Sequence, residues 1–155
     1  MNSSKNAFTM IEMVFVIVVL GILASIAMPK LAATRDDAVI TKGRADIASI
    51  RSAIVTERQS RLIKGCSTFI ANGTSTDDTT TCTGLTMKQL DAGGLFGGVL
   101  MYPITASTGN DGWSATAGSG TYVYKVSGSS NTFAYTPADG KFLCTEGTEC
   151  ALLAN

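Results

Sequence analysis

The stretch NAFTMIEMVFVIVVLGILASIAMPK, residues 6–30, decides how the rest of the chain is interpreted. Between Phe8 and Met28 the residues are apolar or small and uncharged, with the single exception of a carboxylate, Glu12. As a helix, this segment would be about 31 Å long, which matches the roughly 30 Å of hydrocarbon in a bilayer. A helix buried in a soluble core is normally apolar on one side only, so we expect a transmembrane helix. Lys5 precedes it, which favours a cytoplasmic N-terminus.

The carboxylate of Glu12 needs an explanation, because a charge at mid-span costs about 2.5–3.5 kcal/mol on insertion scales and less near the end. In one interpretation Glu12 lies shallow enough to reach the membrane interface. In the other, the chain is cut before Phe8, and the new ammonium group neutralises Glu12 of the same or a neighbouring copy. Such a pair would fix the axial stagger of packed helices, since any other stagger would leave a buried charge unpaired.

The run Phe8-Thr9-Met10-Ile11-Glu12, followed by an apolar segment that contains Gly21 and ends at Pro29, resembles a known family. It is similar to the N-terminus of type IV prepilins and of the pseudopilins of type II secretion systems. The resemblance covers about the first 60 residues. It implies cleavage between Ala7 and Phe8 by an inner-membrane prepilin peptidase, and N-methylation of Phe8. The family usually has Gly before the cut; Ala7 is small enough that we expect processing.

Gly21 and Pro29 bracket the end of the predicted membrane segment. Proline lacks an N–H group and clashes with the preceding turn, so Pro29 should kink the helix. Glycine costs about 1 kcal/mol relative to alanine in a helix, which makes residues 22–28 comparatively easy to unwind. The resemblance implies local unwinding there in a filament. Close helix packing is the alternative role for Gly21.

Composition limits the possible functions of the chain. Its 155 residues contain 12 Lys+Arg and 12 Asp+Glu, so no basic excess favours a nucleic acid partner. Only 15% of residues are charged and 16 are glycine, which suits a β-rich head outside the cytoplasm. Histidine is absent and no GxSxG motif occurs, so the sequence does not predict an enzyme.

The four cysteines form two pairs that are close in sequence, Cys66 with Cys82 and Cys144 with Cys150. Four cysteines allow three connectivities, and we favour this local one. Disulfides in an oxidising compartment fit better than a zinc site, which usually has tighter ligand spacing. Closing the longer loop would stabilise the fold by about 3 kcal/mol, and closing the shorter one by somewhat less.

Residues 30–64 are predicted to form a stalk helix that continues the membrane segment. Ile40, Ile47, Ile50 and Ile54 recur at helical spacing, and Gly65 is a plausible helix stop. The charged residues of this stretch should largely occupy the remaining, solvated surface: Lys42, Arg44, Asp46, Arg51, Glu57, Arg58 and Arg61. An alternative is that Arg35, Asp36, Asp37 and Arg44 make contacts between stacked subunits.

Residues 66–112 lack periodicity and are predicted to be a loop region, in which Asp77-Asp78 is a weak candidate for calcium; no other cofactor is expected. From Trp113 onward the pattern predicts antiparallel strands at 121–128, 131–136 and 140–145, with hairpin turns at 128–130 and 137–140. The aromatic side chains should form a core against the isoleucine face of the stalk: Trp113, Tyr122, Tyr124, Phe133, Tyr135 and Phe142. The expected fold class is therefore α+β, with a long N-terminal helix packed on a small antiparallel sheet, as in pilins.

We expect three parts: a cleaved leader (1–7), a transmembrane and assembly helix (8–29) and a periplasmic head (30–155). The resemblance implies a structural subunit that leaves the inner membrane for a periplasmic or extracellular filament. Its implied partners are copies of itself, related minor pilins, the prepilin peptidase, an inner-membrane assembly platform and the membrane. A pseudopilin for type II secretion or competence is the first expectation, and a type IV pilin for adhesion or motility is the second. An anchored periplasmic binding domain, sensor or enzyme is a remote alternative.

Overall fold

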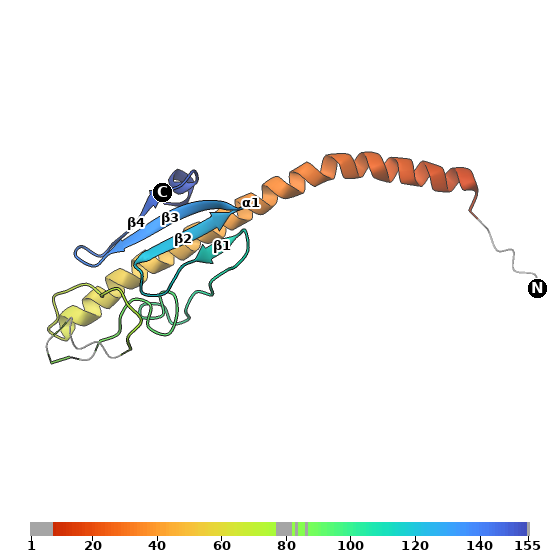
Figure 1. The fold of residues 1–155 in the computed structure, drawn as a ribbon. Helices are drawn as coiled ribbons and strands as arrows, with labels where there is room; N and C mark the ends of the chain where they lie inside the picture. Colours follow the sequence, from red (N-terminus) through yellow and green to blue (C-terminus); the bar gives the residue numbers. More distant parts are fainter. Residues whose placement is uncertain (1–7, 77–81, 83, 86, 155) are drawn as a thin grey trace, which may run out of the picture. The chain divides into compact units, whose positions relative to one another are not determined.

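The computed structural model describes residues 8–76, 82, 84–85 and 87–154. Ala7 and the rest of the expected leader lie outside the described residues, and so does the calcium candidate Asp77-Asp78. In chain order the elements are one long helix, four strands and one short helix. Figure 1 shows the strands forming a single small sheet. The predicted α+β fold is confirmed.

Helix α1 runs from Met10 to Ile63 and contains Pro29 in its interior. It ends one residue before the predicted Lys64, in a turn that satisfies its last carbonyl groups. The N–H of Cys66 donates to the carbonyl of Arg61 (2.9 Å), and that of Gly65 donates to the carbonyl of Leu62 (3.0 Å). Gly65 has a φ of 85°, so this is a Schellman motif with glycine in the left-handed position, and Gly65 is confirmed as the stop.

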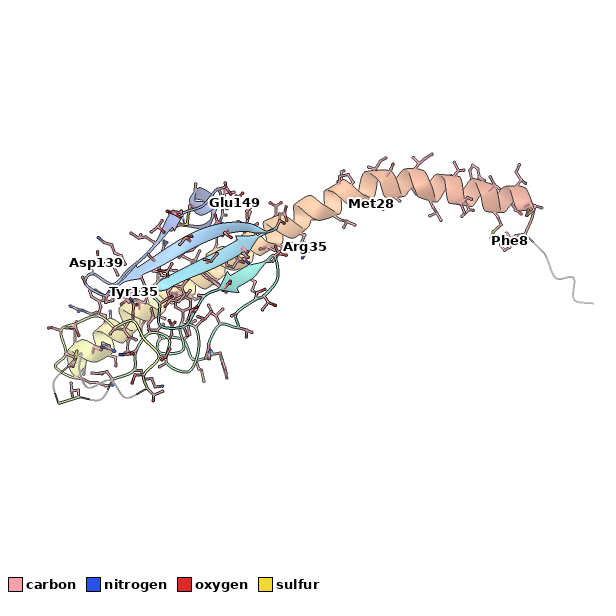
Figure 2. All side chains as sticks on the ribbon, viewed as in Figure 1. Phe8, Met28, Arg35, Tyr135, Asp139 and Glu149 are labelled. Atoms are coloured by element: carbon pink, nitrogen blue, oxygen red, sulfur yellow. A yellow bond between two sulfur atoms is a disulfide. The ribbon has the colours of Figure 1, made fainter. Side chains whose placement is uncertain are left out.

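The chain divides into two compact units, residues 1–37 and 38–155. In the first unit the apolar side chains stand out all around the helix between Phe8 and Met28, as Figure 2 shows. Their exposed fractions reach 87% at Met10 and fall no lower than 37%, at Val19. By length and composition this part of α1 could cross a membrane.

In the second unit the sheet is a meander of neighbouring antiparallel strands. Its strands are β1 (Gly112–Ser114), β2 (Thr121–Val126), β3 (Ser129–Thr136) and β4 (Lys141–Glu146), and α2 (Cys150–Leu153) follows. The hairpin of β2 and β3 is tighter than predicted, because β3 begins at Ser129 and the turn is Ser127-Gly128. Both turn residues have positive φ, 48° and 85°, which is the type I′ geometry that matches strand twist. Asp111 stabilises the turn by accepting a hydrogen bond from the N–H of Ser127 (2.8 Å).

One apolar cluster joins α1 to the sheet. Ile47, Ile50 and Ile54 are at most 1% exposed, and Ile40 packs at the edge of the cluster. The six predicted core aromatics are all buried there, together with Phe96 from the loop region. Ring pairs such as Trp113–Phe133 (5.5 Å between centroids) and Phe133–Phe142 (5.4 Å) fill the centre. Alternating strand residues thus meet the isoleucine face of α1, as the sequence predicts.

The prediction of a solvated charged surface on the stalk holds only in part: Lys42 and Arg44 are exposed, whereas Arg61 is buried and the other charged residues of this stretch are partly buried. Arg61 is 1% exposed, and its guanidinium donates to Glu57 (3.1 Å) and to the carbonyl of Lys88 (2.7 Å). Asp46 accepts a hydrogen bond from the indole N–H of Trp113 (3.0 Å). Arg51 donates to the carbonyl of Phe142 (3.1 Å). These side chains link loops and strands to α1 by hydrogen bonds. The helical spacing of the sequence could not predict these partners, because the spacing contains no information on the path of the loops.

The C-terminal segment is held against α1 by several contacts. Leu153 is 1% exposed and packs beside Gly43, where an added Cβ would lie 2.8 Å from its side chain. Arg44 donates to the carbonyl of Leu152, and Arg51 donates to that of Ala154 (3.2 Å). The structure contains the disulfides Cys66–Cys82 and Cys144–Cys150, and the second attaches the start of α2 to β4.

Candidate assembly site

The first turn of α1 contains the carboxylate that the sequence singles out. Glu12 accepts hydrogen bonds from the backbone N–H of Thr9 (2.9 Å) and from its hydroxyl (2.8 Å). In return, the hydroxyl oxygen of Thr9 lies 3.4 Å from the N–H of Glu12. This reciprocal arrangement is a capping box, in which a threonine and a glutamate three residues later satisfy donors at the start of a helix. Glu12 therefore has a role within its own chain.

Sequence reasoning missed the part played by Thr9. The signal was present in Thr9-Met10-Ile11-Glu12, which is the T-x-x-E pattern of a capping box ahead of an apolar run. Both bonds from Thr9 end on the same carboxylate oxygen, Oε2. A carboxylate has two acceptor oxygens, so the capping box is compatible with a second donor on Oε1. Glu12 can thus cap the start of α1 with Oε2 and still accept a hydrogen bond from a second, positively charged donor on Oε1.

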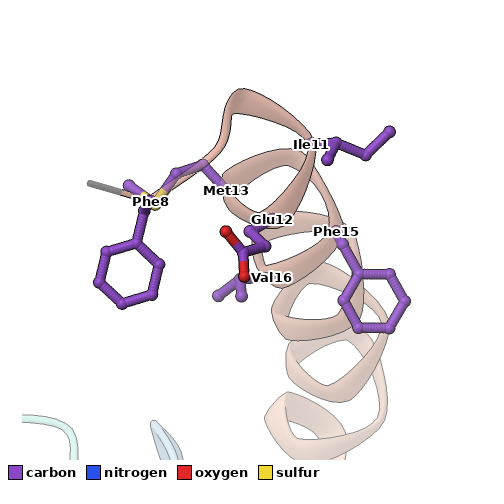
Figure 3. A pocket seen from close by; sticks show the side chains of 6 residues that line it. All are labelled: Phe8, Ile11, Glu12, Met13, Phe15 and Val16. Atoms are coloured by element: carbon purple, nitrogen blue, oxygen red, sulfur yellow. The ribbon is translucent and has the colours of Figure 1, made fainter. Parts of the chain in front are cut away.

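Around Glu12, large apolar side chains form a hollow of about 630 Å³. It is lined by Phe8, Ile11, Glu12, Met13, Phe15 and Val16. Figure 3 shows the carboxylate of Glu12 between the side chains of Phe8 and Phe15. Phe8 is 81% exposed and Phe15 67% exposed. An apolar surface of this kind is covered only when lipid or another apolar helix surrounds it, and a charge enclosed there needs a partner.

The other predicted positions lie further along the same helix. Gly21 has open space around it, because an added Cβ would meet nothing within 4 Å. Pro29 is inside α1, and the predicted kink and unwinding remain predictions. Between them, the hydroxyl of Ser25 donates to the carbonyl of Ile22 (2.7 Å). Such bonds from serine to the preceding turn slightly destabilise helices, which is a further reason to expect weakness in residues 22–28.

The cleavage site is described on one side only, since Phe8 is the first described residue and Ala7 lies outside. Among the described residues no group of three or more His, Cys, Asp or Glu side chains is placed to hold a metal ion. The calcium candidate, as noted, falls outside them. The candidate residues that the structure brings together are therefore Phe8, Thr9 and Glu12, at the start of α1.

A family model of known proteins matches the same segment. Residues 2–28 match the family model described as "Prokaryotic N-terminal methylation motif". A protein named type II secretion system core protein G from Pseudomonas aeruginosa is 38% identical over 50 residues, which are 32% of this chain and 35% of that protein. Its namesake from Klebsiella michiganensis is 41% identical over 53 residues, 34% of this chain and 37% of that one.

The chain thus spans about a third of the length of the curated relatives that it matches. No solved structure gave a significant match. The N-terminal resemblance to prepilins and pseudopilins is confirmed by the motif and by both relatives.

Proposed function

Because its N-terminus carries the prepilin methylation motif, we propose that this chain is a structural subunit of a type IV-like filament. The observation that carries the proposal is the exposed apolar segment of residues 8–28, whose only charged residue, Glu12, lies in the first turn of α1. In water such a surface is unstable, whereas in a bilayer or in a bundle of identical helices it is buried. No catalytic role is proposed.

The chain is processed before it assembles. An inner-membrane prepilin peptidase cuts between Ala7 and Phe8 and methylates the new N-terminus. The processed subunit then resides in the inner membrane with its N-terminus on the cytoplasmic side. An assembly platform extracts it from the membrane into the filament. The match to the methylation motif supports both processing steps. Mass spectrometry of the mature N-terminus tests them: an intact leader in purified filaments would contradict this route.

Glu12 sets the register of the assembled helices. Inside a bundle of α1 helices, its carboxylate lies in low-dielectric surroundings and is strongly favoured to pair with the ammonium group on Phe8 of a neighbouring copy. Thr9 occupies one carboxylate oxygen within the chain, and the second oxygen is offered to the neighbour. Helices with the wrong stagger leave two charges unpaired, so one stagger is selected.

Two substitutions of Glu12 separate the register role from the capping role. Glu12→Gln keeps a side chain that can complete a capping box but removes the charge. Glu12→Val removes both. We expect both variants to insert in the membrane and both to fail in filament formation, measured by electron microscopy of sheared or overproduced filaments. Normal filaments from Glu12→Gln would show that Glu12 acts only as a cap.

Within this class, a pseudopilin of a type II secretion system is the first proposal, because both relatives are core proteins of that system. Related minor pilins would then be its partners in the periplasm. A type IV pilin for adhesion or motility is the second candidate, favoured by the Cys144–Cys150 loop near the C-terminus. Deleting the gene distinguishes them: loss of protein secretion supports the first function, and loss of surface filaments supports the second.

A further inference from the structure

The capping box sets the residue at which α1 begins. Helix α1 starts at Met10, and its first backbone hydrogen bond runs from the N–H of Met13 to the carbonyl of Thr9 (3.3 Å). Phe8 and Thr9 precede the helix and are not helical. The peptide bond before Phe8, which the proposed processing breaks, therefore comes before the first helical residue instead of lying inside the helix.

Thr9 is the N-cap of this helix, and it uses both its side chain and its backbone. The N–H of Glu12 donates to the hydroxyl oxygen of Thr9 (3.4 Å), and the N–H of Thr9 donates to Oε2 of Glu12 (2.9 Å). A helix leaves the N–H groups of its first turn without backbone acceptors, and a threonine cap satisfies one of them. Helix α1 can thus begin at Met10 without another turn of backbone carbonyls before it.

Two apolar side chains support the same boundary. Phe8, directly before the cap, and Met13, four residues after it, line one hollow. Figure 3 shows the side chain of Met13 extending toward Phe8. These are the two positions of a hydrophobic staple, which fixes the angle at which the chain enters a helix. The cap and the staple therefore both define the start of α1.

Without the Thr9 hydroxyl, the nearest alternative acceptors are backbone carbonyls of the leader. Another helical turn would pair the N–H of Ile11 with the carbonyl of Ala7, because helical hydrogen bonds join residues four apart. In apolar surroundings an unpaired backbone N–H is costly, so the loss of the cap favours this extension. The carbonyl of Ala7 belongs to the bond that is cut. A helical hydrogen bond would occupy it, whereas an extended chain offers its backbone groups to a partner.

We propose that Thr9 is a positioning residue for leader cleavage. By capping α1, it keeps the bond between Ala7 and Phe8 out of the helix and open to the prepilin peptidase. The peptidase does not have to contact the Thr9 side chain for this effect. The inference rests on the proposed processing, and adds to it a residue that acts through the conformation of the chain.

Two substitutions that differ by one oxygen atom test the proposal. Thr9→Ser keeps a hydroxyl cap, whereas Thr9→Ala removes it and also favours a helical backbone. The full-length chain in detergent is incubated with the peptidase, and loss of the leader is followed by gel mobility and mass spectrometry. We expect Thr9→Ser to be cleaved at the wild-type rate and Thr9→Ala about five-fold more slowly. Equal rates for the two variants would overturn the proposal.

A proline distinguishes a helix boundary from direct recognition of the hydroxyl by the peptidase. Proline is favoured at the first position of a helix, and it holds the residue before it in an extended conformation. Met10→Pro added to Thr9→Ala should therefore restore the start of the helix at residue 10, and with it the wild-type rate of cleavage. If the double variant stays slow while Met10→Pro alone is cleaved normally, the peptidase reads the hydroxyl itself and the proposal is wrong.

The helix boundary is also measurable without the peptidase. Backbone chemical shifts from NMR of the full-length chain in detergent micelles report which residues are helical. We expect non-helical shifts at Phe8 and Thr9 in the wild type and in Thr9→Ser, and helical shifts at residues 7–9 in Thr9→Ala. Non-helical shifts there in Thr9→Ala overturn the proposal whatever the cleavage rates. A wild-type chain that the peptidase leaves intact contradicts the proposed processing instead.

Discussion

Removing the carboxylate of Asp91 should destabilise the head more than any substitution at its surface. Asp91 is fully buried in the loop region, outside any element of secondary structure. It accepts hydrogen bonds from the N–H of Phe96 (2.8 Å), the N–H of Gly118 (2.6 Å) and the hydroxyl of Tyr122 (2.8 Å). One side chain therefore ties two loop segments to strand β2. It also holds Phe96, whose φ of 59° is unusual for a bulky residue, in the aromatic core.

The size of the loss in the free energy of unfolding follows from the three hydrogen-bond donors that would lose Asp91 as their acceptor. A buried donor without a partner costs about 1–3 kcal/mol, and the three together cost about 3 kcal/mol or more. Burial raises the pKa of the Tyr122 phenol, and the hydrogen bond to Asp91 raises it further, so the hydroxyl remains a donor at all ordinary pH values. For Asp91→Ala we expect a loss of about 3–5 kcal/mol in the free energy of unfolding, after allowing for the relieved burial of a charge.

Denaturant unfolding of the full chain in detergent measures this loss, with the fluorescence of Trp113 as the probe. Trp113 is the single tryptophan and is 2% exposed in the head core. Tyr122→Phe serves as the partner in a double-mutant cycle. In the wild-type background it should cost about 1 kcal/mol, and in the Asp91→Ala background it should cost nothing, because the hydroxyl then has no acceptor. A free energy of unfolding for Asp91→Ala within about 1 kcal/mol of wild type, or fully additive effects in the cycle, would refute the reasoning.

Two further predictions concern the head. Gly43→Ala should lower stability by about 1 kcal/mol, because crowding of about 1–3 kcal/mol against the Tyr124 ring, 2.6 Å from the new Cβ, exceeds the gain of about 1 kcal/mol in helix propensity. Ser49→Ala, on the exposed side, is the control and should be neutral. Burial raises the pKa of Tyr124 and of Tyr135 to about 12, from an ordinary 10.0. The unfolded chain therefore releases these protons first, so stability should be full below pH 10 and fall between pH 10 and 12, as alkaline titration by circular dichroism will show. A flat profile across that range would contradict their burial.

The sequence was sufficient for the features that depend on local pattern. The apolar run from Phe8 to Met28, interrupted only by the charge of Glu12, predicts the exposed helix there, because its length and composition leave few alternatives. The spacing of Ile47, Ile50 and Ile54 identifies the face of α1 that packs on the sheet, and alternation in 121–126 identifies the inward side of β2. Gly65 predicts the helix stop. The T-x-x-E pattern at Thr9 was also readable, although its meaning emerged only from the hydrogen bonds.

The tertiary structure alone decided which partners the polar side chains find. Arg61 is buried and Asp91 joins the loops to β2, because long-range contacts satisfy groups that periodicity places in solvent. The turn between β2 and β3 is Ser127-Gly128, and Asp111, distant in sequence, accepts a hydrogen bond from its backbone. Local pattern is set by neighbours along the chain, whereas hydrogen-bond partners are set by the path of the loops, which no periodicity encodes.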